Sequence, residues 1–170
     1  MRCGFAALAV VAAVVMGGPA EAKDFLFDMG TATSELRPGF IRITAKSVYS
    51  KETGYGWKSA EGLKEHYKHY GREWEYNESR GQKQPPPIYT NEITCDCVWS
   101  TKPNTLLVDV PPGEYTVWLL CGRSAGSSRE YHDFDVSAGS AGAGKGTVKI
   151  PGPYRFEKRL LRVEAGGGQL

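Results

Sequence analysis

The sequence predicts an all-β fold, an antiparallel β-sandwich of jelly-roll type with one short helical insertion. Short runs of alternating apolar and polar residues recur along most of the 170-residue chain, and glycine- and proline-rich turns separate them. Only the segment 60–76 has apolar residues at helical spacing. The length suits one domain with a core of its own.

The first 22 residues have the plan of a secretory signal peptide. A basic start at Arg2 precedes the apolar run 5–16, and the small-x-small site 20–22 follows. We expect cleavage before Lys23, so that residues 23–170 form a secreted or periplasmic protein. The apolar run is shorter than the roughly 20 residues of a spanning helix. No later segment is apolar enough to cross a bilayer, and we expect no membrane span.

The charge pattern argues against a nucleic-acid partner. The formal net charge is only +2, and the lysines and arginines are scattered through the predicted loops. A polyanion-binding surface would gather them into a stripe or patch.

The first predicted strands are short and regular. We expect strands at 24–29 and 40–44, joined by a turn-rich connection. The clearest unit is 105–121, where two alternating runs flank the turn 111–113, and we expect a β-hairpin there. The residues that share its inner face are Leu106, Val108, Val110, Tyr115, Val117 and Leu119.

The later strands lead to an unusual ending. We expect strands at 131–137 and 147–150, followed by a last pair at 154–156 and 160–164. The glycines 166–168 signal a hairpin turn, but only two residues follow them. The sequence therefore predicts a truncated final strand and an unpaired edge at 160–164, which would favour self-association.

Residues 60–91 read as an insertion into this pattern. An amphipathic helix is expected over 60–76. The stretch 77–89 contains the three prolines 85–87, which cannot donate backbone hydrogen bonds, and it is expected to be an extended surface excursion. The apolar stripe of the expected helix consists of Leu63, Tyr67, Tyr70 and Trp74.

Export leaves three cysteines in an oxidising compartment. Cys3 leaves with the signal, and Cys95 and Cys97 would point to one face of a strand, too far apart for an unstrained bond. A bridge from either to Cys121, such as Cys97–Cys121, is the disulfide we expect, with free buried thiols as the alternative. Zinc binding with His132 is less favoured because the usual ligand spacings are absent.

Two strings resemble catalytic motifs but lack the structural context. The glycine-rich string 139–147 resembles a phosphate-binding loop, yet strand and turn residues follow it where a helix is needed. The string 122–126 matches a nucleophile elbow, with Ser124 as nucleophile and His132 downstream. It also leads into a strand, so a small serine esterase is the weaker alternative.

The segment 54–57 is the candidate binding site. Tyr55 and Trp57 flank Gly56 and face the same way in a strand. If exposed, the two rings would stack on a pyranose; burial under the sheet edge is the alternative. The charged residues expected to hold the sugar hydroxyls are Lys58, Glu61 and Arg123.

Six strings together resemble a known module. They are 25–30, 38–40, 49–50, 54–57, 107–117 and 132–134. In this order they resemble the galactose-binding-like β-sandwich at the N-terminus of rhamnogalacturonan acetylesterases and related polysaccharide-degrading proteins. The resemblance spans nearly the whole mature chain, and the insertion, the cysteines and the missing final strand depart from it.

The resemblance implies a jelly-roll fold and a non-catalytic association with polysaccharide, because a separate domain carries the esterase chemistry in such enzymes. It also implies a structural calcium, although no loop shows a regular spacing of acids. The carboxylates available to it are Asp28, Glu35, Asp133 and Asp135. The sequence thus predicts an exported carbohydrate-binding module, with a structural or protein-interaction module of the cell envelope as the alternative.

Overall fold

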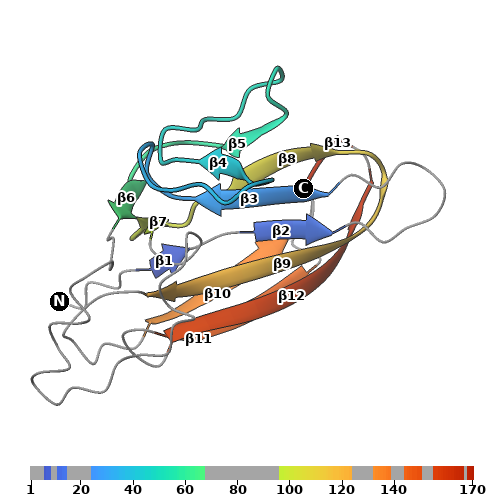
Figure 1. Ribbon diagram of the computed structural model, residues 1–170. Coiled ribbons are helices and arrows are strands. Elements are labelled where there is room, and N and C mark those ends of the chain that lie inside the picture. Colours follow the sequence, from blue (N-terminus) through green and yellow to red (C-terminus); the bar gives the residue numbers. More distant parts are fainter. Residues whose placement is uncertain are drawn as a thin grey trace, which may run out of the picture.

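The computed structural model describes residues 6–8, 11–14, 24–67, 96–123, 132–138, 144–150, 155–166 and 168–170. Within these ranges the protein is all-β and contains no helix (Figure 1). Four of the predicted strands, 24–29, 40–44, 131–137 and 147–150, are confirmed. The described part therefore has no helix long and apolar enough to cross a membrane.

The largest sheet has five strands in the order β12-β9-β2-β3-β4. Its strands are β12 (Arg155–Ala165), β9 (Gly113–Arg123), β2 (Val11–Val14), β3 (Phe25–Met29) and β4 (Ile41–Ile43). Neighbours are antiparallel except β3 and β4, which run parallel. In Figure 1 the long strands β9 and β12 run side by side along this sheet.

Three smaller antiparallel sheets complete the described part: β13-β8-β5, β1-β7-β6 and β10-β11. Their strands are β13 (Gly168–Gln169), β8 (Leu106–Val110), β5 (Tyr55–Trp57), β1 (Ala6–Leu8), β7 (Asp96–Ser100), β6 (Lys64–Tyr67), β10 (His132–Ala138) and β11 (Gly144–Ile150).

The core forms where the inward faces of several strands meet. Phe25 and Phe27 of β3 stack with ring centroids 5.9 Å apart, and Phe27 also contacts Tyr55 of β5 at 5.3 Å. Because alternate residues of a strand face opposite sides, each strand contributes apolar residues at a period of two. Other buried members are Met29, Ile43, Trp57, Val98, Val108, Val110, Tyr115, Leu119, Leu161 and Val163.

The predicted hairpin at 105–121 is wrong in its pairing. Both strands are present, and Val108 and Val110 are buried as expected. However, β8 pairs with β5 and β13, whereas β9 pairs with β2 and β12. The turn after β8 therefore passes the chain from one sheet to another, and the Tyr115 hydroxyl donates a hydrogen bond to the Pro111 carbonyl at 2.6 Å across it.

The predicted unpaired strand at 160–164 is also wrong. β12 is one continuous strand, and it pairs with β9 along its whole length, from Arg155 opposite Arg123 to Ala165 opposite Gly113. The chain then reaches β13, and the backbone of Leu170 exchanges two hydrogen bonds with that of Val108, at 2.9 and 3.0 Å. The strand on which the self-association prediction depended thus has a partner, β9, on one side, although it is the outer strand of its sheet.

The predicted helical insertion is not seen where the structure describes it. Residues 60–63 form a turn, and β6 follows, antiparallel to β7. Leu63 and Tyr67 are half-buried, while Lys64 and His66 are exposed, which is the two-residue period of a strand. The remaining stripe residues, Tyr70 and Trp74, lie outside the described residues.

Candidate functional site

The two aromatic rings of β5 pack inward and do not form a binding surface. Trp57 is only 1% exposed, and its indole Nε1 donates a hydrogen bond to the Thr44 carbonyl at 2.9 Å. Tyr55 is half-buried against Phe27. The prediction that both rings face the same way is correct, but the prediction that they stack on a sugar is wrong for Trp57, because that ring belongs to the core.

Gly56 allows the backbone to approach closely at this point. Its φ is 142°, and a Cβ there would lie 2.5 Å from the backbone nitrogen of Tyr49. The amide of Trp57 donates to the Ser47 carbonyl at 2.7 Å, and the amide of Tyr49 donates to the Trp57 carbonyl at 2.9 Å. The glycine therefore allows the backbone of residues 47–49 to pack directly against β5. It does not create space for a ligand.

The three charged residues predicted beside the rings come from separate parts of the fold. Lys58 is exposed, and the exposed Glu61 pairs with Lys102 at 2.7 Å between Oε1 and Nζ. The hydrogen bond and charge of Lys102 lower the pKa of Glu61. Arg123 ends β9, opposite Arg155 in the five-stranded sheet, while Lys58 follows β5 of another sheet.

The predicted disulfide between Cys97 and Cys121 is not formed. Both are free thiols; Cys97 is half-buried and Cys121 is buried. Burial raises the pKa of each thiol to about 12, so neither is activated as a thiolate. Their strands, β7 and β9, belong to different sheets, which strand alternation could not reveal. Cys95 lies outside the described residues.

The predicted ligands for calcium do not assemble in the described part. There, no group of three or more histidine, cysteine, aspartate or glutamate side chains could hold a metal ion. Asp28 is buried in β3, whereas Glu35 and Asp135 are exposed. The side chain of Asp133 is outside the described set, as is Ser124 of the predicted esterase pair, so that pair stays a prediction.

A buried polar cluster that the sequence did not indicate joins β4, β7 and the loop after β3. The Ser34 hydroxyl donates to Oδ2 of Asp96, and Nη1 of Arg42 donates to the Ser34 hydroxyl at 2.6 Å. Arg42 also donates to the carbonyls of Thr31 and Ser34, and its Nη1 lies 3.9 Å from Oδ2 of Asp96. The arginine thus holds the loop and partly compensates the carboxylate.

Asp96 occupies this cluster at a cost in electrostatic free energy. It is 3% exposed, and within the described part of the chain its Oδ1 accepts no hydrogen bond. Burial raises the pKa of Asp96, while the Ser34 hydrogen bond and the Arg42 charge act in the opposite direction. Gly30 packs directly against the buried Asp96 side chain, so a Cβ at position 30 would clash with its carboxylate. Ser34 and Asp96 are buried and Arg42 is half-buried, and we assign the cluster a structural role.

Replacing Asp96 with asparagine is expected to change how stability depends on pH. Because the folded pKa is raised above its ordinary value of 3.8, the folded state holds this proton more tightly than the unfolded state does. The contribution of Asp96 to the unfolding free energy is therefore full below pH 3.8 and is lost as the pH rises through the folded pKa. Asp96→Asn should gain stability relative to wild type over that window.

Urea unfolding between acid and neutral pH measures this effect, with Glu35→Gln as an exposed control. A difference between wild type and Asp96→Asn that stays constant across the window, like that of the control, would contradict the raised pKa.

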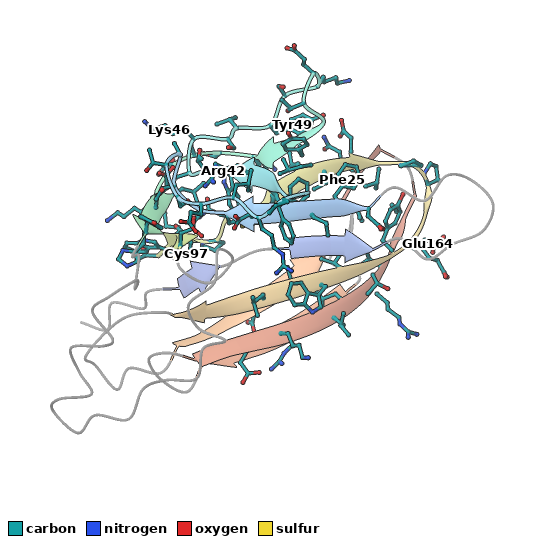
Figure 2. All side chains as sticks on the ribbon, viewed as in Figure 1. Phe25, Arg42, Lys46, Tyr49, Cys97 and Glu164 are labelled. Atoms are coloured by element: carbon teal, nitrogen blue, oxygen red, sulfur yellow. The ribbon has the colours of Figure 1, made fainter. Side chains whose placement is uncertain are left out.

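A second polar cluster, on the surface, ties a loop to two strands. The Tyr49 hydroxyl donates to the Asp109 carboxylate, with oxygen distances of 3.0 and 3.2 Å, and Nε2 of Gln169 donates to the same carboxylate at 3.0 Å. Desolvation, followed by the hydrogen bond and charge of Asp109, raises the pKa of Tyr49. Tyr49 is labelled on the upper side of the view in Figure 2. These contacts clamp the 45–54 loop onto β8 and β13.

The side of β9 and β12 that faces away from the core carries a mixed apolar and basic surface. Leu160 is 65% exposed and lies opposite the half-buried Trp118. The half-buried Leu120 lies opposite the exposed Lys158, and the exposed Arg162 follows Leu160 by two residues on the same side. We call these five residues the β9–β12 outer face.

This outer face has an acidic end. Glu164 and Glu114 lie opposite each other and are both exposed. Glu164 is labelled in Figure 2, where it projects from the end of the sheet. Alternation along β9 and β12 could have suggested this face. Leu119, Leu161 and Val163 are buried, so the residues next to them in each strand point outward. The sequence analysis assigned the inner residues of β9 and overlooked the outer ones.

Comparison with known proteins supports the fold alone. No family model and no curated protein matches the chain. The crystal structure of the protein YxiM from Bacillus subtilis matches with a TM-score of 0.52 and 19% sequence identity. The match covers 85% of this chain and 33% of that one, so the chain spans about a third of the YxiM structure.

Proposed function

We propose that this chain is an exported, non-catalytic β-sandwich module that binds polysaccharide through the β9–β12 outer face. The observation that carries the proposal is the pairing of Trp118 with the 65% exposed Leu160, with Lys158 and Arg162 on either side of that leucine. This site replaces the one at Tyr55 and Trp57.

The chemistry of the outer face suits a sugar chain. An indole ring and a leucine side chain offer apolar contact to the CH faces of pyranose rings. Lys158 and Arg162 are four residues apart, about 13 Å along the strand, and both can donate hydrogen bonds to hydroxyls or carboxylates. A ligand that contacts both ends of the face would therefore be an oligosaccharide and not a single sugar.

Two further points support a module that acts beside a larger protein. The similar YxiM chain is about three times as long as the portion matched, so this fold occurs there as one part of a longer chain. The resemblance to the galactose-binding-like modules of polysaccharide-degrading proteins supports the same reading and the export that the N-terminal segment predicts.

A polysaccharide array tests this function with wild type and two tryptophan variants. We expect wild type to bind, and Trp118→Ala to bind at least tenfold more weakly. Trp99→Ala is the matched control, because Trp99 is also half-buried but lies in β7 of another sheet, next to the Lys64 ammonium at 5.0 Å from its ring. Equal binding by Trp118→Ala and wild type would rule out the outer face as the site.

A structural or protein-interaction module of the cell envelope is the second candidate, and the 65% exposure of Leu160 favours it. Exposed leucine beside an aromatic ring is typical of protein-docking surfaces as well. In that case, wild type would bind none of the polysaccharides, while Leu160→Ser would lower its association with a protein partner or with itself. Light scattering of wild type and Leu160→Ser distinguishes this outcome.

A further inference from the structure

The strand β2 lies at the centre of the five-stranded sheet. It pairs antiparallel with β9 at four positions, from Val11 opposite Leu119 to Val14 opposite Thr116. On its other side it pairs antiparallel with β3, where Ala12 and Ala13 lie opposite Leu26 and Phe25. Figure 1 shows β2 between these two strands. It is therefore the only link in this sheet between β12-β9 and β3-β4.

The same residues belong to the predicted export signal. Val11–Val14 falls within the apolar run 5–16, and cleavage before Lys23 would remove it. Removal leaves one strand width open between β3 and β9, with backbone N–H and C=O groups facing the gap on both sides. Unpaired backbone groups of this kind are a template for an added strand.

The two halves of the sheet cannot simply close over the gap. Because β3 and β9 are both antiparallel to β2, they run parallel to each other, and their separation across β2 is about twice the 4.8 Å strand spacing. Closing the gap would shift one half by about 5 Å. The buried residues Phe25 and Phe27 of β3, and Leu119 of β9, would then have to repack.

We propose that the processed chain is a strand acceptor, in which the position between β3 and β9 takes an extended apolar segment of another polypeptide. The inference goes beyond sugar binding and rests on the proposed export. It adds main-chain recognition, in which the backbone supplies the hydrogen bonds and alternate side chains supply the selectivity.

The residues now in this position define the donor. The sequence is Val-Ala-Ala-Val, uncharged and small, with Ala12 opposite Trp118 of β9. The donor is accordingly an antiparallel strand of small and β-branched apolar residues. A second copy is a poor donor, because the outer strands of the sheet are charged: β4 is Ile-Arg-Ile, and β12 carries lysine, arginine and glutamate.

The test uses the full chain with a protease site inserted between Ala22 and Lys23. Hydrogen exchange is first measured on the uncut chain, where the amides of Val11–Val14 should be protected. After cleavage, the released N-terminal segment is removed and a fluorescent peptide of residues 5–16 is added. Binding of this peptide to the cleaved chain is measured by its fluorescence anisotropy. The control peptide carries Ala12→Pro and Ala13→Pro, which remove two backbone donors and keep the peptide apolar.

We expect the cleaved chain to bind the 5–16 peptide at least tenfold more tightly than the proline peptide, and the amides of β3 and β9 to gain protection when it binds. Three results would overturn the proposal. The first is that the Val11–Val14 amides are unprotected in the uncut chain. The second is that the cleaved chain binds the two peptides equally. The third is that the amides of β3 and β9 are fully protected in the cleaved chain without peptide. A dimer that protects β3 and β9 would assign the position to a second copy and overturn it too.

Discussion

Replacing Trp57 with alanine is expected to reduce the unfolding free energy by about 3–5 kcal/mol. The ring is 1% exposed, so the substitution leaves a large cavity, and the Thr44 carbonyl loses the hydrogen bond from Nε1. Because small domains are stable by only about 5–15 kcal/mol, such a loss would leave a marginal fold. Urea unfolding monitored by circular dichroism measures it.

Trp118→Ala is the matched control for this experiment. Trp118 is half-buried on the outer face, so its loss should destabilise the protein clearly less than the loss of Trp57. The pair of variants separates two effects: Trp57→Ala lowers stability, and Trp118→Ala lowers binding. A Trp57→Ala protein that unfolds within about 1 kcal/mol of wild type would contradict the core placement of this ring.

Replacing Gly56 with alanine is expected to cost about 2–5 kcal/mol. The added Cβ would lie 2.5 Å from the Tyr49 nitrogen, 2.6 Å from the Val48 carbonyl carbon and 2.7 Å from the Ser47 carbonyl oxygen. All three are backbone atoms, which cannot rotate away as a side chain could. The φ of 142° adds conformational strain for any residue with a Cβ.

Gly39→Ala separates the two causes. Gly39 has a φ of 85°, but nothing lies within 4 Å of a Cβ placed there. This variant should lose only the conformational term, about 1 kcal/mol. Thermal unfolding of both variants provides the comparison, and equal losses would show that the close approach of residues 47–49 to β5 is not what requires glycine at position 56.

The strands of this protein could be predicted from sequence, but their partners could not. Alternation located β3, β4, β8 and β10, because a strand with one buried face shows a period of two whatever lies beside it. It could not show that β8 and β9 belong to different sheets. Leu63 and Tyr67 are four residues apart, a spacing that fits both a helix and one face of a strand. Residues 64–67 form a strand because they pair with β7.

The candidate site was limited by the same ambiguity. Tyr55 and Trp57 were correctly placed on one side of a strand, but a period of two does not say which side is buried. The Ser34, Arg42 and Asp96 cluster had no local signal at all, because its members come from separate parts of the chain. The outer face of β9 and β12 needed the register of two strands about 40 residues apart, which strand propensity does not supply.

The hydrogen bond between Ser34 and Asp96 joins residues 62 positions apart. A contact with so large a loop to close forms late, since the entropy of the intervening chain must be lost first. The segment after β3 therefore lacks these contacts, and Arg42 stays solvated, until β7 is in place. Order in the loop after β3 thus depends on a strand that lies far along the chain.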